Sequence, residues 1–578
     1  MLSYRNLAMC VLGRPLHTGG GIDSPRPASQ RAAAFILTAA MLTTLAAPAF
    51  AGTWYIEDGD ITVKAGETEG TNKVSQGANQ EVEDTDTIIK NREDTASSNT
   101  VTINAEDKND KVEVTLKDVN IDTSSRNKAA VSVTGSGNTT IKLDGDNHLT
   151  GGNGIYSNSS GSLTISGDEN DSLTAQGGDS RNGIYSVSGD VTISGGTVTA
   201  TGGNSTGSYG SGGDGIHSGS LTISGGTVTA TGGGSTGSNG LGGRGICSDS
   251  GGVTISGGTV KATGGNGSDG GSGISSSSGV TVSDGTVTAN GGNGGNVSGD
   301  GIRSDGGVTI SGGTVKAAGG DSKDGYGGDG IRSGGVVTIS GNTVNAAGGY
   351  GGKVGGYGIC SFDRVAISGG TVEAAGGNGS TGGGSGIYSS DIDLSGSLEL
   401  TAKAGSPNGK ALSQRGNELD LNTIKDKLGP GAKVTVTDAN GKVNQVSIPR
   451  PVEPEEPSSS SDGGSAAPSA PAFSLPGLTV TDKDGQRISY TSTQSGNTLT
   501  VCVGRFTASF RISLAALRQL RAEGEGIETI TFQTVLCSTT LSLDELLAMG
   551  GEDAEVVLTH HIRSSTLTVG GKDVCKDV

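Results

Sequence analysis

Apolar and polar residues alternate in a short segment that recurs along the middle of the chain. On one side of the alternation in a representative copy lie Val191, Ile193, Val198 and Ala200. The residues between them are Thr and Ser, and a period of two is typical of a strand with one buried face. Gly195-Gly196 interrupts the alternation where the chain must turn, because glycine adopts backbone angles that other residues avoid. Each copy therefore predicts short strands joined at a glycine corner.

The dipeptide Gly-Ile marks a repeat of about 28 residues, with its Ile at positions 155, 184, 216, 246, 274, 302, 331, 359 and 387. Each unit predicts three short strands, with the patterns GIxS, VTIS and TVTA. A single unit buries almost no apolar surface, so the units must stack and bury continuous columns of Ile, Val and Ala. The repeat therefore predicts a parallel β-solenoid.

The length of the unit varies in one place, between the Val of TVTA and the next Gly-Ile. All the long loops, such as residues 201–215, are therefore expected at one corner. Loops confined to one corner indicate either a functional face or loops whose variable length is merely tolerated. Residues 52–150 alternate less regularly, as expected of terminal units that cap an open edge. Roughly eleven or twelve rungs result, which at about 4.8 Å per rung predicts a rod about 55 Å long.

One stretch resembles a known family. VEVTLKDVNIDTSS and AAVSVTGSGNTTIKLDGDNHLTGG, followed by GIYS and serial LTISGG units, resemble the bacterial secreted carbohydrate-binding β-helix proteins over about residues 55–405. The resemblance implies a right-handed parallel β-helix, similar in fold to the pectate lyases. It also implies binding of polysaccharide, including acidic plant polysaccharide, with bound calcium in characterised relatives. No metal site of that family maps residue by residue onto this sequence.

The rest of the chain divides by composition into segments of different character. Residues 1–51 contain an apolar run ending in Ala49-Phe50-Ala51, which predicts a signal peptide rather than a membrane span, and hence a secreted or cell-surface protein. The predicted order after it is a β-helix over 52–404, its cap over 405–448, a Pro/Ser-rich linker over 449–476 and a small α+β domain over 477–578. The cap is expected to hold a short helix within 418–431 and a hairpin over 432–448. The predicted fold class is therefore mainly β, with a C-terminal α+β domain whose role the sequence does not indicate.

Composition and charge narrow the functional classes. Gly accounts for 107 of the 578 residues and aromatic residues for only 3%, which excludes one ordinary globular core of this size. No proline lies between Pro48 and Pro407, as continuous backbone pairing requires. The net charge of −19 argues against a nucleic-acid partner, which would need clustered Lys and Arg. An extracellular protein, or one whose carboxylates hold cations, is compatible with this charge.

The residue that follows each Gly-Ile forms a column that is expected to point outward. Its members suited to a sugar ligand are Tyr156, Tyr185, His217, Arg303, Arg332 and Tyr388. Aromatic rings offer flat faces to sugar rings, and Arg can hold a carboxylate with two hydrogen bonds. The column therefore predicts an acidic polysaccharide lying along the rod. The alternative is an exposed, variable column that binds nothing.

Three carboxylates near the same corner, Asp214, Asp300 and Asp329, are candidate calcium ligands, because oxygen-rich glycine loops can hold Ca²⁺. The alternative is that these residues are solvated turn aspartates. Cys247 and Cys360 occupy equivalent positions four rungs apart, about 19 Å, which is too far for a disulfide. No CxxC spacing indicates a zinc site.

The sequence thus predicts a secreted, non-catalytic protein that binds polysaccharide. One alternative is a structural or adhesin-like spacer that displays the C-terminal domain to a cell-surface or protein partner. The other is a polysaccharide lyase, which would need clustered Asp and an Arg or Lys base. The spacing of Asp and Arg here repeats no catalytic signature, so an enzyme is not expected.

Overall fold

The computed structural model describes residues 51–449 continuously and most of the C-terminal part. The described C-terminal residues are 477–482, 486–488, 490–495, 497–503, 505, 507–523, 527–534, 538–551, 554–560 and 565–573. The chain separates into two compact units, Met1–Glu453 and Pro454–Val578. Nearly all of the predicted signal peptide and of the predicted linker lies outside the described residues. Within the described part, no helix has the length and apolar character needed to cross a membrane.

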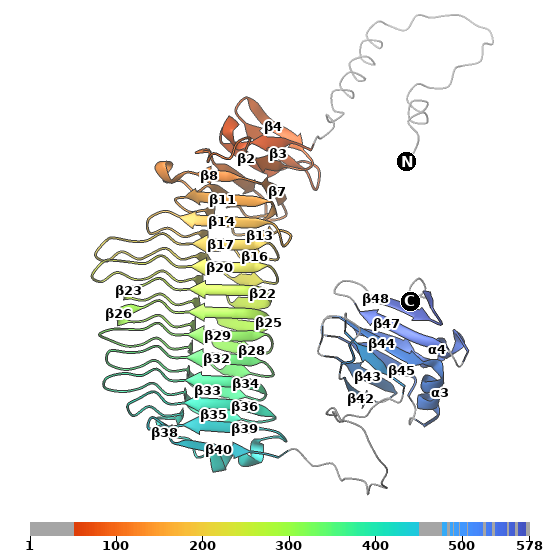
Figure 1. The fold of residues 1–578 in the computed structure, drawn as a ribbon. Coiled ribbons are helices and arrows are strands. Elements are labelled where there is room, and N and C mark those ends of the chain that lie inside the picture. The colour runs from red at the N-terminus through yellow and green to blue at the C-terminus, as the bar shows by residue number, and fades with distance from the viewer. Residues whose placement is uncertain are drawn as a thin grey trace, which may run out of the picture. The chain divides into compact units, whose positions relative to one another are not determined.

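The first unit is a right-handed parallel β-solenoid whose strands stack in three columns (Figure 1). The Gly-Ile column consists of β2 (Ile61–Ala65), β6 (Val101–Ala105), β9 (Val131–Gly135), β12 (Ile155–Ser157), β15 (Ile184–Ser186), β18 (Ile216–Ser218), β21 (Ile246–Ser248), β24 (Ile274–Ser276), β27 (Ile302–Ser304), β30 (Ile331–Ser333), β33 (Ile359–Ile367), β35 (Ile387–Leu394) and β37 (Leu412–Gln414). This column alone contains thirteen strands. The predicted solenoid is confirmed, but the predicted eleven or twelve rungs were too few, because the irregular first rungs hold more strands than their sequence indicates.

The second column carries the TIS pattern, and its strands also pair in parallel. It consists of β1 (Thr53–Tyr55), β5 (Ile88–Lys90), β7 (Lys111–Lys117), β10 (Asn138–Asp144), β13 (Leu163–Ser166), β16 (Val191–Ile193), β19 (Leu221–Ile223), β22 (Val253–Thr263), β25 (Gly279–Asn290), β28 (Gly307–Ile310), β31 (Val337–Ile339), and parts of β33 and β35.

The third column carries the TV pattern. It consists of β8 (Asn120–Asp122), β11 (Asp146–Gly151), β14 (Ser172–Gly177), β17 (Thr197–Thr201), β20 (Thr227–Thr231), parts of β22 and β25, β29 (Thr314–Ala318), β32 (Thr343–Ala347), β34 (Gly370–Ala375), β36 (Leu398–Lys403) and β39 (Lys433–Thr437).

The core is the space enclosed by the three columns. In one rung, Ile274, Val282 and Val287 point inward and are fully buried. Each stacks on its equivalent in the rungs before and after, for example Ile274 on Ile246 and Ile302. One continuous apolar cluster therefore runs from end to end. A core only one side chain deep on each wall explains how so low a hydrophobic content can sustain a fold of this length.

Glycine makes the corner between the TIS and TV strands, as the pattern predicts. The second residue of the Gly-Gly pair has a positive φ, for example 74° at Gly196 and 74° at Gly313. Where Asn342 replaces that glycine, the positive φ moves to the preceding Gly341, at 82°. The turn therefore follows glycine, because only a residue without a Cβ enters this region at little cost.

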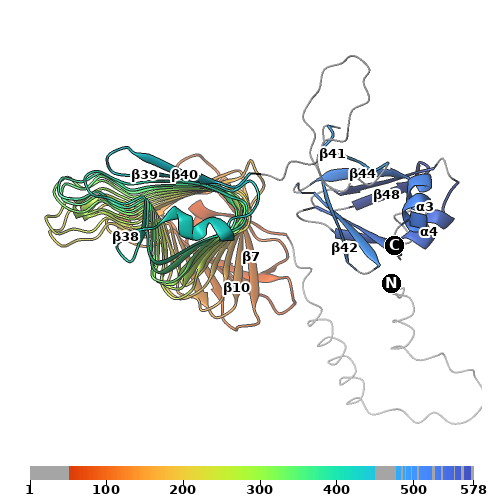
Figure 2. The ribbon, with the colours of Figure 1, turned by 90° about the horizontal axis from the view of Figure 1, so that it is seen from below.

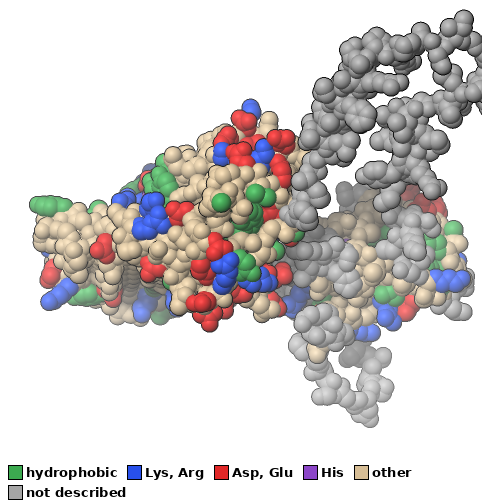
Figure 3. All heavy atoms as spheres, turned by 90° about the horizontal axis from the view of Figure 1, so that it is seen from above, with side chains coloured by type: hydrophobic (Ala, Val, Ile, Leu, Met, Phe, Trp, Pro, Cys, Tyr) green, Lys and Arg blue, Asp and Glu red, His purple; other side chains and the backbone are tan. Residues whose placement is uncertain are grey.

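Both ends of the solenoid are covered. At the N-terminal end, β3 (Asn72–Gln76) and β4 (Asn79–Asp84) fold back antiparallel on β2, with the short 3₁₀-helices η1 (Ile56–Asp58) and η2 (Ser124–Arg126) beside them. Acidic and basic side chains mix over this end (Figure 3). At the other end lie β38 (Asn417–Glu418), η3 (Leu421–Lys427) and β40 (Val443–Ser447), which pairs antiparallel with β39. The predicted cap hairpin is confirmed, while the predicted helix is a 3₁₀-helix.

The long loops all project from one corner, as predicted, and they stack in register (Figure 2). Two glycine columns close the base of each loop. Gly299 N–H donates to Gly292 O at 2.9 Å, and Gly292 N–H donates to Gly271 O of the previous rung at 2.8 Å. Further out, β23 (Gly267–Asp269) and β26 (Gly294–Val297) pair with each other. The loops are therefore an ordered extension of the solenoid.

The described residues of the second unit form two sheets and two helices. One sheet consists of β41 (Thr479–Thr481), β44 (Ala508–Ser513), β47 (Glu555–His560), β48 (Ser565–Val569) and β49 (Lys572–Asp573), and the other of β42 (Thr491–Ser495), β43 (Thr498–Cys502), β45 (Thr529–Gln533) and β46 (Ser538–Ser542). The helices α3 (Leu514–Glu523) and α4 (Leu543–Ala548) begin after Ser513 and Ser542, whose hydroxyls accept backbone N–H groups of the first turn. These strands and helices give the unit the α+β character that the sequence predicts, and they share a core of their own.

Candidate functional site

The outward column of the Gly-Ile strands is in unbroken register. Its residues in rung order are Tyr156, Tyr185, His217, Cys247, Ser275, Arg303, Arg332, Cys360 and Tyr388. All six predicted sugar-binding side chains therefore lie on one line at intervals of about 4.8 Å per rung. The structure brings Tyr156, Tyr185 and His217 together, and it brings Arg303 and Arg332 together.

A second line of polar residues, here called the polar ladder, runs beside this column. It occupies the position two residues before each Ile and contains Asn153, Asn182, Asp214, Arg244, Ser272, Asp300, Asp329, Tyr357 and Ser385. Its Asn and Asp side chains accept backbone N–H groups of the next rung. Asn182 Oδ1 accepts the N–H of Asp214 at 2.7 Å, and Asp329 Oδ1 accepts the N–H of Tyr357 at 2.7 Å. The polar ladder thus joins consecutive rungs just before their Gly-Ile strands.

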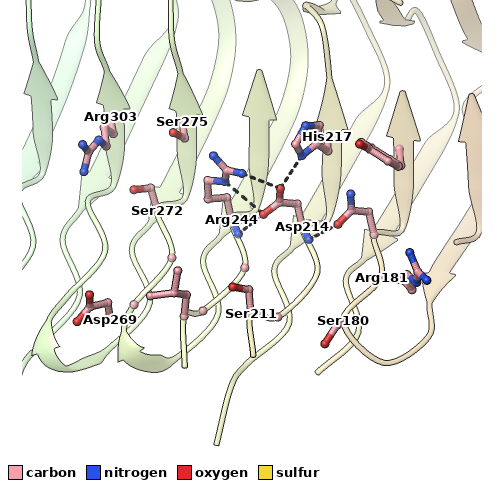
Figure 4. Close-up of a pocket in the computed structure, with 18 of the residues that line it drawn as sticks. Ser180, Arg181, Ser211, Asp214, His217, Arg244, Asp269, Ser272, Ser275 and Arg303 are labelled. Carbon is pink, nitrogen blue, oxygen red and sulfur yellow. Dashed lines mark hydrogen bonds and ion pairs between the residues drawn. The ribbon is translucent and has the colours of Figure 1, made fainter. Parts of the chain in front are cut away.

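The stacked loops form one wall of a groove whose floor is the outward column. One part of the groove, about 670 Å³ in volume, is lined by His217, Ser275 and Arg303 on the floor and by Arg181 and Asp269 on the loop side (Figure 4). The column was expected to point outward, yet Cys247 and Cys360 in it are each only 1% exposed.

Aromatic rings lie next to one another at two places along the groove. The Tyr156 and Tyr185 ring centroids are 5.7 Å apart, and the Tyr185 and His217 centroids are 4.9 Å apart. Farther along, the rings of Tyr357 and Tyr388 stack at 4.9 Å with an interplanar angle of 16°. The groove therefore has an aromatic platform on either side of its arginines.

The first charged group in the groove, here called the histidine cluster, consists of Asp214, His217, Arg244, Cys247 and Asp249. The His217 ring lies between two carboxylates, with Nδ1 2.8 Å from Asp214 Oδ2 and Nε2 2.9 Å from Asp249 Oδ2. Arg244 Nη2 donates to Asp214 Oδ2 at 3.2 Å, and Cys247 Sγ donates to Asp249 Oδ1 at 3.1 Å. Figure 4 shows Arg244 and His217 pointing toward Asp214 from adjacent rungs.

Burial and charge set the ionisation of this cluster. Burial opposes the charged form of Asp214, but the hydrogen bond with His217 and the charge of Arg244 outweigh it, so the pKa of this carboxyl lies below its usual value. Burial raises the pKa of the Cys247 thiol well above its usual value. Cys247 is therefore a protonated thiol in neutral solution, which does not favour a cysteine nucleophile.

The second charged group, here called the aspartate pair, consists of Asp300 and Asp329 on adjacent rungs of the polar ladder. Both residues are buried, and Arg332 Nη1 donates to Asp329 Oδ2 at 3.2 Å. Burial and the neighbouring Asp300 charge raise the pKa of Asp329 to about 7, against the opposing effect of Arg332. Burial also raises the pKa of Asp300.

The three predicted calcium ligands do not form one site. Asp300 and Asp329 lie together, whereas Asp214 lies three rungs away in the histidine cluster. Oxygens of all three carboxylates already accept backbone N–H groups, and Arg244 and Arg332 place a positive charge beside Asp214 and Asp329. This donor set does not fit a calcium cage, which needs six to eight free oxygens.

Sequence reasoning missed Arg244, Asp249 and Tyr357 as parts of the groove. A signal for two of them was present, because Arg244 and Tyr357 occupy the same position before Gly-Ile as Asp214 and Asp329. Following that position as a column in its own right would have revealed the polar ladder.

Comparison with known proteins supports the fold only. The sequence profile of the beta helix repeat family matches residues 221–243, 253–278 and 308–331. These segments lie within the regular rungs of the solenoid. Neither the curated proteins nor the solved structures yielded a match.

Proposed function

We propose that the protein binds an acidic extracellular polysaccharide along the groove of the solenoid and does not modify it. The observation that carries this proposal is the exposed and weakly paired side chain of Arg303. Its side chain is 52% exposed, and its one ion pair among the described residues is a contact of 4.0 Å with the exposed Asp305. A guanidinium held this loosely in a groove is available to a carboxylate from outside.

The neighbours of Arg303 extend this site into a line. Arg332 lies on the next rung, where its guanidinium is 5.1 Å from the centre of the Phe362 ring. The Tyr357–Tyr388 stack lies beyond Arg332, and Tyr185 lies on the other side of Arg303. The rung spacing of about 4.8 Å is close to the length of one sugar residue in an extended polysaccharide. A linear polymer therefore suits the repeat of this groove better than a compact ligand does.

A binding role is favoured over a lyase because the groups a lyase would use have other partners. Asp300 and Asp329 each use a carboxylate oxygen to accept a backbone N–H of the next rung. A general acid or base would have to leave that ladder to reach a sugar. We further propose that calcium assists the binding and that the protein is exported from the cell. The C-terminal unit would then contact a cell-surface or protein partner.

The experiment is retention of the full-length chain on insoluble calcium pectate and on cellulose at about 0.15 M salt, which screens the negative net charge. The arginine variant is Arg303→Ala/Arg332→Ala. The matched control is Lys261→Ala/Lys316→Ala, which removes two exposed charges from the TV column of the same solenoid. We expect retention on pectate to fall at least tenfold in the arginine variant and to be unchanged in the control.

Other outcomes separate the alternatives. Retention unchanged in the arginine variant would leave a binder but discard this groove as its site. Unsaturated products released from polygalacturonate would support the lyase. The spacer is favoured if there is neither retention nor product. Repeating the wild-type assay with and without a chelator on covalently crosslinked pectate tests calcium, because a chelator would dissolve calcium pectate itself.

A further inference from the structure

We propose that the histidine cluster binds a divalent transition-metal ion of the Zn²⁺ class. The proposal stands independently of polysaccharide binding. Asp214, His217 and Cys247 offer a carboxylate oxygen, a ring nitrogen and a thiol sulfur that all lie within 4.8 Å of one another. Asp214 and His217 come from one rung, and Cys247 is the register partner of His217 on the next. Parallel stacking therefore places the thiol of Cys247 beside a carboxylate and an imidazole from the previous rung.

The distances suit a tetrahedral site after a small adjustment. In such a site, metal bonds of about 2.0 Å to N and O and about 2.3 Å to S place the ligand atoms roughly 3.3–3.6 Å apart. Here the His217 Nδ1 to Asp214 Oδ2 separation is 2.8 Å, and no pair of the three ligand atoms exceeds 4.8 Å. Shifts of roughly 1 Å, which side-chain rotations supply, would produce the geometry that Zn²⁺ prefers.

The surroundings supply the supports that metal ligands usually have. A metal-bound histidine normally donates its other ring N–H to a carboxylate, which fixes its tautomer and orientation. Both ring nitrogens of His217 have a carboxylate oxygen within 2.9 Å, so the nitrogen that does not bind the ion keeps an acceptor. Arg244 donates to Asp214 and holds that carboxylate in place.

The ligand types select the class of ion. A thiolate and an imidazole favour zinc and its neighbours, whereas calcium and magnesium require oxygen ligands throughout. On binding, the S–H bond of Cys247 breaks, its proton leaves to the solvent, and a sulfur–metal bond forms. The new thiolate and the carboxylates of Asp214 and Asp249 offset the positive charge that the ion adds beside Arg244.

The site would keep one position open. Asp214 and His217 line the groove of about 670 Å³, whereas Cys247 is buried beneath it. An ion held by three protein ligands would therefore present its fourth position to the groove, the arrangement found where a metal meets water or a bound ligand.

The structure also supplies a matched control. Cys360 occupies the same column position and is equally buried, but its register partners are Arg332 and Tyr388. It has no imidazole beside it, so the proposal assigns it no metal.

The test is titration of the full-length, reduced protein with Co²⁺, which reports a sulfur ligand by a thiolate-to-cobalt charge-transfer band. We expect one such band in the wild type and in Cys360→Ser, displaced by Zn²⁺. We expect its loss in Cys247→Ser and in His217→Gln, and about 10- to 100-fold weaker binding in Asp249→Asn.

Circular dichroism checks that each variant is folded. If either Cys247→Ser or His217→Gln is not folded, the remaining variant tests the proposal. A band of equal strength in a folded Cys247→Ser protein would overturn the proposal, because the sulfur would then belong to another cysteine. A band of equal strength and affinity in a folded His217→Gln protein would also overturn it, because the imidazole would then not be a ligand. The absence of any band in the wild type would overturn it as well.

Discussion

Asp300 Oδ1 accepts the backbone N–H of Asp329 at 2.8 Å, so two buried carboxylates lie on adjacent rungs of the solenoid. The polar ladder gains a hydrogen bond from this arrangement, and the two like charges repel. Arg332 forms an ion pair with Asp329 and its charge also acts on Asp300, but burial outweighs this effect on the pKa of both carboxyls. The aspartate pair therefore favours a bound proton in the folded state.

The first prediction concerns how stability depends on pH. The folded-state pKa of Asp329 is about 7, above the value of about 4 expected in the unfolded chain. Between these values the folded state binds a proton that the unfolded state does not, so stability falls as pH rises from about 4 to about 7. We expect the thermal midpoint of the solenoid to fall by a few degrees between pH 5 and pH 8, since about 1 kcal/mol shifts a large domain by about 2 °C.

Asp329→Asn is the variant that isolates this effect. Asn153 and Asn182 already occupy the polar ladder, and Asn182 Oδ1 accepts a backbone N–H as Asp329 does. The variant should therefore fold and keep the ladder, with a thermal midpoint that changes less between the two pH values. A wild type and a variant with parallel pH profiles would show that Asp329 does not carry the effect.

The sequence predicted the solenoid because its evidence is local and repeated. A period of two, a glycine corner and the Gly-Ile marker recur in every regular rung, and each fixes strand, turn or register by itself. The same register placed Arg303 beside Arg332 and Tyr156 beside Tyr185, as the structure shows.

The details of the candidate site could not be predicted, because they depend on contacts between residues of different rungs. The pairing of His217 with Asp249 joins different rungs and requires the reach of both side chains. The burial of Cys247 has no signal in the sequence, because the alternation alone places this residue on the outward side of its strand. The N-terminal rungs were undercounted from the sequence because their alternation lacks the Gly-Ile marker.

The second prediction tests the glycine columns at the base of the loops. A Cβ on Gly292 would lie 2.0 Å from the backbone oxygen of Gly265 in the previous rung. That oxygen belongs to the stacked backbone and cannot move aside as a flexible side chain could. Gly292→Ala should therefore separate two rungs locally and cost about 1–3 kcal/mol, as overpacking commonly does. Hydrogen exchange of the loop amides would show faster opening in residues 264–299.

Gly295→Ala is the matched control within the same loop. A Cβ there would meet nothing closer than 3.6 Å, and the backbone angles are ordinary. This variant should leave exchange unchanged. Equal exchange in both alanine variants would mean that the glycine columns do not hold the loops.

The third prediction concerns the Ile column. Ile274 is fully buried between Ile246 and Ile302, so Ile274→Ala leaves a cavity that the stacked rungs cannot close. A loss of about 2–5 kcal/mol is expected. Urea unfolding followed by circular dichroism should show a lower midpoint. Thr281→Ala, at an exposed position of β25 in the same rung, should change the free energy of unfolding by less than about 1 kcal/mol. A similar loss in both variants would contradict a core held by stacked Ile side chains.

The fourth prediction follows from the line of the proposed binding site. Tyr185 and Tyr388 are separated by seven rungs of the outward column, or about 34 Å. If each rung meets about one sugar, the affinity for oligogalacturonates should rise with chain length up to about seven or eight sugars and then level off. Isothermal titration calorimetry with a length series measures this directly.

Neutral cello-oligosaccharides of the same lengths provide the control for charge. They can stack on the tyrosines but offer Arg303 and Arg332 no carboxylate, so their affinities should be weaker at every length. A levelling-off at one or two sugars would instead indicate a compact pocket at one rung. In that case the alignment of the outward column would serve the fold, and the histidine cluster would become the stronger candidate for a ligand site.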